Sequence, residues 1–236
     1  MINEYVVLDL EMTGLSAKTD HIIEIGAVKI KNNEIVETME CLVNPRCKIP
    51  SRVSELTGIT DEMVQKGEDK DEAIAALLAF IDGHILVGQN INFDYSFLKQ
   101  WAVNHKKPLE AYACDTLKLA RVLLPAEQSK KLESLCLYFG IERKREHRAL
   151  DDAIETWQVF EKLKMLAMER ENGETYLKPI PLTYKAKKQS PATQKQIERL
   201  REYRQKHQIS DEINWETLTK SEASRIMDKY ILVYGR

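Results

Sequence analysis

Two acidic residues end the first apolar stretch of the chain, because Asp9 and Glu11 follow a run of valine and leucine and precede Thr13 and Gly14. Side chains alternate across a strand, so these two carboxylates share one face, roughly 6 to 7 Å apart. Like charges that close on a buried strand raise each other's pKa unless a cation lies between them. A D-x-E pair alone is more often the solvated end of a strand, although a Thr-Gly turn can bring backbone close to a ligand.

A third candidate acid, Asp94, lies where a short strand gives way to a helix for which Asn92 is a natural N-cap. The residues three, four and seven positions after Asp94 are apolar: Phe97, Leu98 and Trp101. This stripe predicts that Asp94 faces the core. Two explanations stay open, because an acid in a first turn is stabilised by the helix dipole and could equally be a ligand pointing into a site.

The start of the longest predicted helix carries His147, Asp151 and Asp152. At helical spacing, Asp152 continues through a largely apolar stripe, made of Thr156, Val159, Leu163 and Leu166, whereas Asp151 continues through Glu155, Gln158 and Lys162. We therefore predict that Asp152 points inward and Asp151 outward. Histidine exchanges protons near neutral pH and suits a general base. A lone loop histidine is usually a surface residue, but of five histidines only His147 precedes an inward acid.

Together these segments supply four inward carboxylates and one histidine at strand ends and helix starts: Asp9, Glu11, Asp94, Asp152 and His147. Several buried carboxylates are costly without divalent metals. Oxygen ligands favour Mg²⁺ or Mn²⁺. Two such ions about 4 Å apart are a known device for hydrolysing phosphodiesters.

The elements that must position these side chains follow from apolar periodicity. Strands are predicted over Tyr5 to Leu10, Ile22 to Ile30, Ile35 to Val43 and Ile85 to Val87, with a turn at Asn32 and Asn33. Helices are predicted over Asp71 to Ile81, Phe93 to Val103, Thr116 to Leu124, Leu132 to Phe139 and Ala149 to Arg170. This order indicates an α/β fold in which helices flank a mixed sheet.

The C-terminal part differs in charge from the rest. Residues 1–172 carry 22 basic and 29 acidic groups, net −7, and residues 173–236 carry 13 and 8, net +5. Glycine and prolines after Asn172 predict a domain over 1–172, a linker over 173–190 and a small basic helical module over 191–236. Capping boxes at Thr193-x-x-Gln196 and Thr219-x-x-Glu222 predict its two helices.

The basic residues of this part have two interpretations. They are Lys185, Lys187, Lys188, Lys195, Arg199, Arg201, Arg204 and Lys206. One interpretation is a solvated helix face. The other is a clamp on nucleic-acid phosphates, extended by stacking on Tyr203 or Trp215.

Composition excludes several classes of protein. No apolar run approaches the length of a membrane span, and no signal peptide precedes the first strand, so we expect a cytoplasmic protein that does not associate with a membrane. Four cysteines without a C-x-x-C pair suit reduced thiols better than disulfides or zinc.

The motifs resemble those of the DEDDh 3′–5′ exonucleases, the family that contains the proofreading epsilon subunit of bacterial DNA polymerase III, ribonuclease T and oligoribonuclease. The resemblance covers roughly residues 1–170. The matching segments are Asp9-x-Glu11-x-Thr13-Gly14, Ile22-Ile23-Glu24-Ile25-Gly26, Asn90-x-x-Phe93-Asp94 and His147-x-Ala149-x-x-Asp152. Gln89 departs from the pattern, since epsilon-like members often carry histidine there.

The resemblance implies a ribonuclease-H-like sheet in which Asp9, Glu11, Asp94 and Asp152 hold two Mg²⁺ or Mn²⁺ ions and His147 deprotonates the attacking water. It also implies a pocket for the terminal nucleotide, formed by Thr13, Gly14, Leu15, Asn90 and Phe93. The expected function is release of nucleoside 5′-monophosphates from single-stranded DNA 3′ ends, in proofreading or repair and beside a DNA polymerase. The alternatives are an exoribonuclease that trims RNA 3′ ends and a non-catalytic module that binds nucleic acid.

Overall fold

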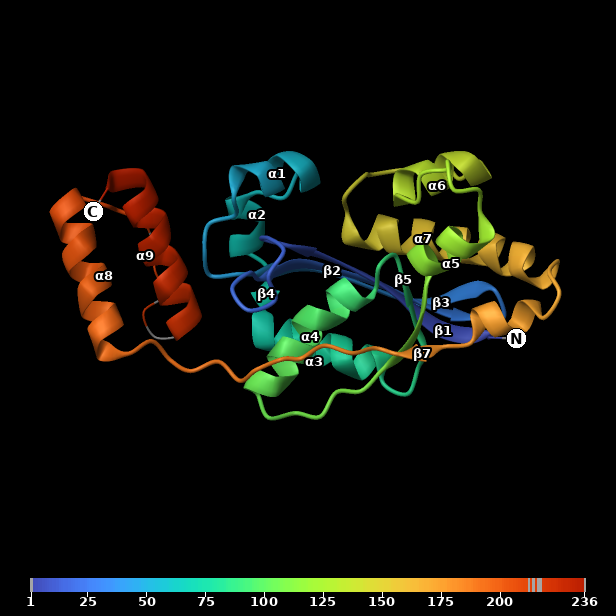
Figure 1. Ribbon diagram of the computed structural model, residues 1–236, viewed down its shortest axis with the longest axis horizontal. Helices are drawn as coiled ribbons and strands as arrows, with labels where there is room; N and C mark the ends of the chain where they lie inside the picture. Colours follow the sequence, from blue (N-terminus) through green and yellow to red (C-terminus); the bar gives the residue numbers. More distant parts are fainter. Residues whose placement is uncertain (1, 212, 214, 216–217, 236) are drawn as a thin grey trace.

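One mixed sheet of seven strands organises the chain in the computed structural model, which describes residues 2–211, 213, 215 and 218–235 (Figure 1). The strand order is β4-β3-β2-β1-β5-β6-β7. The strands are β1 (Glu4–Met12), β2 (Ile22–Lys31), β3 (Glu34–Asn44), β4 (Glu68–Asp69), β5 (Leu86–Gly88), β6 (Tyr112–Asp115) and β7 (Ile180–Pro181). The first three are antiparallel, while β5 runs parallel to β1 and β6 parallel to β5. The predicted mixed sheet is confirmed.

Helices cover both faces of this sheet. They are α1 (Ser51–Thr57), α2 (Asp61–Gln65), α3 (Lys70–Ile81), α4 (Asn92–Asn104), α5 (Thr116–Leu123), α6 (Leu132–Phe139), α7 (Ala149–Met168), the 3-10 helix η1 (Gly173–Leu177), α8 (Gln194–His207) and α9 (Lys220–Tyr234). One core lies between the sheet and helices α3 and α4, and the other lies between the sheet and helices α5, α6 and α7. The alternating side chains of β1 face both cores, as a central strand requires.

The start of α7 is fastened directly to β2. The Glu24 side chain is fully buried and accepts hydrogen bonds from Arg148 Nη2 at 2.5 Å, Arg148 Nε at 2.9 Å and the Ala149 amide at 2.9 Å. Beside it, Gly26 lets the helix backbone approach, since a Cβ there would lie 2.1 Å from the Ala149 carbonyl carbon. The second strand of the sequence motif therefore docks the helix that carries His147 and Asp152.

The predicted boundary after Asn172 is wrong as a description of packing, because the next ten residues join the sheet domain. Helix η1 packs against α7, β7 pairs with β6, and Leu177 and Leu182 are buried in the two cores. Of the prolines that indicated a linker, Pro181 lies in the edge strand β7, where a missing amide donor is tolerated, and Pro179 lies directly before it. Beyond them, both predicted capping boxes are present, and α8 and α9 pack around a small core of their own.

Other elements depart from the sequence prediction by less. Helix α4 begins at Asn92, whose side chain does not cap the helix and instead accepts a hydrogen bond from the Thr183 amide at 3.3 Å. Helices α1 and α2 and strands β4, β6 and β7 were not predicted because each is too short to show a period. Within the described part of the chain, no helix is both long and apolar enough to cross a bilayer.

We predict that Gly26→Ala displaces the start of α7. The added methyl group overlaps helix backbone, so the free energy of unfolding should fall by roughly 1–3 kcal/mol. The exonuclease activity expected from the sequence should fall about 10²-fold, since small misplacements of catalytic groups are that costly. Chemical denaturation and turnover measure the two effects.

Gly83→Ala is the control, because Gly83 has φ +71° and an added Cβ there meets nothing within 4 Å. The left-handed backbone should cost about 1–2 kcal/mol of stability. Activity should persist. Equal losses of activity in the two variants would contradict the docking role of Gly26.

Candidate active site

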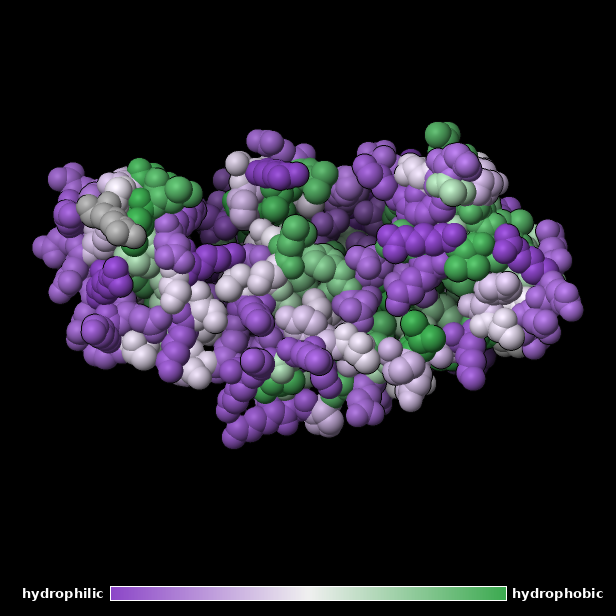
Figure 2. All heavy atoms as spheres, in the orientation of Figure 1, coloured by the Kyte–Doolittle hydropathy of each residue, from purple (hydrophilic) through white to green (hydrophobic). Residues whose placement is uncertain are grey.

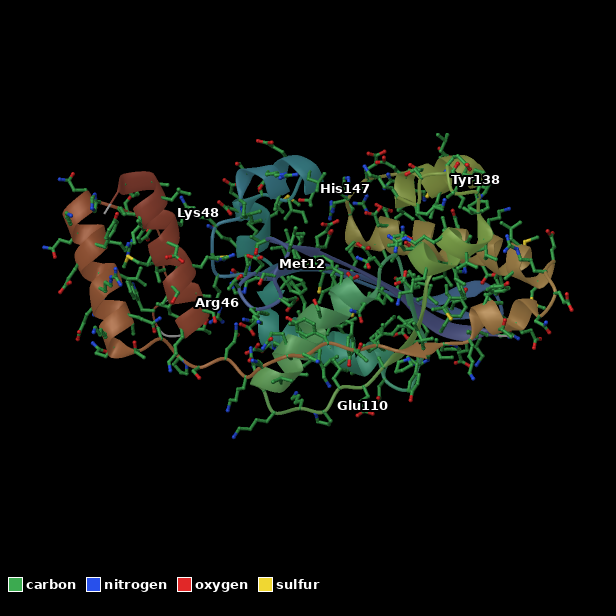
Figure 3. All side chains as sticks on the ribbon, in the orientation of Figure 1. Met12, Arg46, Lys48, Glu110, Tyr138 and His147 are labelled. Atoms are coloured by element: carbon green, nitrogen blue, oxygen red, sulfur yellow. The ribbon has the colours of Figure 1, made fainter. Side chains whose placement is uncertain are left out.

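Three of the predicted site residues converge at the end of β1. Glu11, His147 and Asp152 each offer a ligand atom, and these atoms lie within 4.8 Å of one another. Figure 3 shows His147 at the start of α7, near the end of β1 marked by Met12. His147 has φ +56°, a left-handed turn immediately before Arg148 engages Glu24. The docking of α7 thus brings His147 and Asp152 to Glu11.

Asp9 and Asp94 stand beside this group. Loss of hydration and then the charge of Asp94 raise the pKa of Asp9 well above its usual range, with Glu11 and Asp152 adding to the effect. Burial, followed by repulsion from Asp152, raises the pKa of Glu11 to about 8. Burial also raises the pKa of Asp94 to about 8, against opposing hydrogen bonds from backbone amides. All four predicted carboxylates therefore form one electrostatically coupled cluster.

The neighbours of Asp94 explain its inward position. Its Oδ1 accepts a hydrogen bond from the Leu10 amide at 3.1 Å, which ties the first turn of α4 to β1. Asn90 has φ +60°, and its amide donates to Asp115 Oδ1 at 3.1 Å. The same Asp115 oxygen caps α5. Position in the helix dipole does not account for these contacts, and the inward orientation predicted from the stripe is correct.

Arg143 is a site residue that the sequence did not reveal. Its Nη2 lies 2.8 Å from Asp152 Oδ1, and its Nε lies 2.7 Å from Glu155 Oε2. Burial raises the pKa of Asp152, whereas the Arg143 charge lowers it. Arg143 lies in the loop before α7, nine positions from Asp152, at no helical or strand spacing that would have marked it.

The predicted outward orientation of Asp151 is wrong. Asp151 and Glu155 are both buried, although they lie on the polar stripe of α7. Arg145 Nε contacts Asp151 Oδ2 at 2.5 Å, and Arg143 covers Glu155. Helix α6 and the loop after it pack over this face of α7 and supply arginines that neutralise the acids. A polar stripe indicates solvent only when no other charged segment folds over it.

The predicted pocket residues lie around the turn after β1 and the start of α4. Thr13 is buried, and its Oγ1 accepts a hydrogen bond from the His21 amide at 2.9 Å. A Cβ on Gly14 would lie 2.6 Å from a carboxylate oxygen of Asp20. Leu15 is 85% exposed, and Phe93 contacts Phe97 edge to face with ring centroids 5.5 Å apart. Of the two apolar side chains, Leu15 is exposed and Phe93 is half-buried.

Gln89, the position that departs from the family pattern, is occupied by contacts within the protein. Its Nε2 donates to the Lys130 carbonyl at 2.6 Å, and its Oε1 accepts from Thr116 Oγ1 at 2.5 Å. These bonds hold the end of β5 against α5. In this chain the side chain links two segments of the fold.

The donor set fits divalent cations. Four carboxylates that raise one another's pKa lose that repulsion when a cation lies among them. Their oxygen ligands match the preference of Mg²⁺ and Mn²⁺. An acidic cluster of this kind at the end of a central strand is typical of nucleases that hydrolyse phosphodiesters with bound metals.

The comparisons with known proteins agree with this class. Residues 6–160 match the family model of the exonucleases of the ribonuclease T type, and the chain belongs to this exonuclease family. One relative is the DNA polymerase III PolC-type of Caldanaerobacter subterraneus subsp. tengcongensis, which is 43% identical to this chain over 170 residues. The match covers 72% of this chain and 12% of that protein. The DNA polymerase III PolC-type of Bacillus subtilis (strain 168) is 41% identical over 177 residues, a match that covers 73% of this chain and 12% of that protein. The chain thus spans about an eighth of these relatives.

Solved structures share the fold. Exonuclease I of E. coli in complex with a dT13 oligonucleotide superposes with a TM-score of 0.59 at 19% identity, covering 71% of this chain and 42% of that one. The nuclease domain of 3′hExo, a DEDDh family member bound to rAMP, superposes with a TM-score of 0.59 at 20% identity. This match covers 70% of this chain and 92% of that one. The ribonuclease-H-like fold predicted from the sequence is confirmed.

We predict that the stability of the metal-free protein falls as pH rises. Glu11 and Asp94 have a folded-state pKa of about 8, so the folded protein retains protons that the unfolded chain releases above about pH 4. Stability is therefore lost between about pH 4 and pH 8. A bound divalent ion offsets the repulsion, so the increase in Tm on adding Mn²⁺ should grow with pH. Thermal melts at pH 5, 6.5 and 8, in EDTA and in Mn²⁺, measure this.

Glu11→Gln is the matched variant, because it removes one of the titrating groups at constant size. Its melting temperature in EDTA should depend less steeply on pH than that of the unaltered protein. The same slope in both proteins would show that the cluster does not set the pH dependence.

We predict that the two adjacent aspartates of α7 fail in different ways. Asp152→Asn removes a charge that faces Glu11 and His147 and should lower turnover about 10³-fold or more, several kcal/mol of transition-state stabilisation. Asp151→Asn should keep most turnover and lower the free energy of unfolding by roughly 1–3 kcal/mol, since Arg145 loses the nearer of its two carboxylate partners. Steady-state kinetics and denaturation of both variants test this, and comparable losses of turnover would contradict it.

Proposed function

We propose that this chain releases nucleoside 5′-monophosphates from the 3′ ends of single-stranded DNA, with four carboxylates holding two divalent ions and one histidine acting as general base. The carboxylates are Asp9, Glu11, Asp94 and Asp152, and the base is His147. The observation that carries the proposal is the approach of Glu11, His147 and Asp152 to within 4.8 Å. An acid, an imidazole and a second acid at that spacing can serve one reacting phosphate.

The protein's own groups divide the work of hydrolysis. His147 takes a proton from the water, whose oxygen bonds to phosphorus while the bond from phosphorus to the 3′ oxygen breaks. The 3′ oxygen takes a proton from solvent and stays on the shortened strand as a hydroxyl, and the nucleotide leaves as a 5′-monophosphate. When bound, the divalent ions supply Lewis-acid stabilisation of the charge on the phosphate. Leu15 and Phe93 offer apolar surface to the terminal base, and Asn90 is held beside them by Asp115.

DNA is the proposed substrate because two relatives that are 43% and 41% identical to this chain are named DNA polymerase III PolC-type. The match with the family model ends at residue 160, so the C-terminal module lies outside it. A polymerase partner is proposed on the same likeness. The cytoplasm is the proposed location, and Cys41, Cys47, Cys114 and Cys136 are all free thiols.

Timed digestion of matched 5′-labelled single-stranded DNA and RNA with Mg²⁺, Mn²⁺ or EDTA tests the proposal. We expect a ladder that shortens from the 3′ end of DNA, no products in EDTA, and slower digestion of RNA. Faster digestion of RNA would assign the chain to the exoribonucleases instead. A 5′-blocked and a 3′-blocked DNA strand in the same assay establish the direction of digestion.

We predict that the variant His147→Ala distinguishes a general base from a metal ligand. Loss of a general base should lower turnover roughly 10²- to 10⁴-fold and flatten the acid limb of the pH profile. Mn²⁺ binding, measured by calorimetric titration, should persist in His147→Ala and weaken in Asp152→Ala, once circular dichroism shows both variants folded. Equal loss of Mn²⁺ affinity would make the histidine a ligand rather than the base.

A further inference from the structure

A groove of about 820 Å³ lies between the exonuclease domain and the C-terminal module. It is lined by the turn after β1, including Thr13 and Gly14, by the loop between β3 and α1, and by α9. Figure 3 shows Arg46 and Lys48 on the side of that loop that faces α9. In the space-filling view the same region is a hollow between two bodies (Figure 2). The groove therefore opens onto the turn proposed to receive the terminal nucleotide.

Five acidic and six basic side chains line this groove, and its two arginines are paired with carboxylates. Five carboxylates line it, and each one accepts a hydrogen bond within the protein: Asp20 from Arg225, Asp69 from Arg46, Asp71 from Trp101, Asp211 from Tyr230 and Glu222 from Thr219. Four lysines also line it: Lys18, Lys48, Lys70 and Lys229. Among the described residues, no carboxylate oxygen lies within 4 Å of these four amines. They are free to bind an anion.

The two walls of the groove are joined by specific contacts. Arg225 of α9 donates to Asp20 at 2.6 Å and to the Thr19 carbonyl at 2.9 Å. The segment before α8 is held along α4, where the Gln189 amide donates to Asn104 Oδ1 at 3.0 Å. Because Asp20 also accepts from the Ser16 amide, the module contacts the loop that contains Gly14 and Leu15. The width of the groove is thus set by the fold.

The basic face of α8, by contrast, does not border the groove. Helix α9 lies between α8 and the exonuclease domain (Figure 1). Lys195 and Lys206 are exposed on α8 and are absent from the groove lining. Trp215 lies against Arg201 and Arg204, and Tyr203 stacks on His207, so these aromatic rings are used within the module. The basic residues of α8, for which the sequence left a solvated face and a phosphate clamp open, thus lie outside this groove.

We propose that this groove binds the phosphates of the single strand immediately upstream of the nucleotide being removed, with Lys48 and Lys229 contacting them from opposite walls. The inference rests on the proposed function and assigns the C-terminal module a role in it. A strand whose 3′ end enters the site past Thr13 and Gly14 continues into the space that these same residues line. Unpaired amines along a groove bind backbone phosphates without regard to sequence.

The test compares Lys48→Ala/Lys229→Ala with Lys195→Ala/Lys206→Ala, which removes the same charge from the outer helix. Binding of a fluorescent single-stranded DNA 20-mer is measured by anisotropy in EDTA, where no turnover occurs. The groove variant should bind about ten-fold more weakly, and the slope of log affinity against log salt should shrink by about 1.4, or about 0.7 for each lost contact. The α8 variant should match the unaltered protein.

Circular dichroism and thermal melts supply the control for folding. Both variants should give the spectrum and the melting temperature of the unaltered protein, because all four lysines are exposed at the surface. Equal losses of 20-mer affinity in the two variants, or no loss in either, would overturn the proposal. If the unaltered protein binds the 20-mer through the groove but does not digest it, the proposed function fails while the groove assignment stands.

Discussion

The buried ion pair between Glu24 and Arg148 is the interaction on which the rest of the site depends. It joins the beginning of β2 to the residue immediately before α7, across 124 residues of sequence, and Gly26 beside it allows the backbones to meet. Removing one partner of such a pair leaves an uncompensated charge in the protein interior, so the contact is strongly determined once formed. His147 directly precedes Arg148, and Asp152 follows one helical turn later. The Glu24–Arg148 ion pair therefore fixes the positions of both residues.

The acidic cluster is held together against its own repulsion. Loss of hydration and mutual charge raise the pKa of Asp9, Glu11 and Asp94, which is a cost that the fold carries in the absence of a cation. Backbone amides donating to Asp94 and the guanidinium of Arg143 on Asp152 reduce that cost locally. Groups kept in such an arrangement are prepared for a divalent ion, because a preorganised charged site needs little rearrangement when the ligand arrives.

The C-terminal module extends the site in a different way from the catalytic core. The strands and helices up to α7 supply the chemistry, and the match with the exonuclease family is confined to them. The module contacts the turn after β1 through Arg225 and leaves lysines along the intervening groove. A separate pair of helices attached by specific hydrogen bonds can therefore lengthen the contact with a strand without altering the carboxylates.

Local sequence determined much of this protein: the strands and long helices, both capping boxes, and the inward faces that carry Asp94 and Asp152, because period and capping chemistry act over a few residues. Only the tertiary structure decided that Asp151 is buried, that Arg143 reaches Asp152, that η1 and β7 join the sheet domain, and that α9 rather than α8 borders the groove. Each of these depends on contacts between separate elements or loops, which the periodicity within one helix or strand does not specify. The spacing of residues specifies a face of a helix, but the partner of that face is chosen by packing.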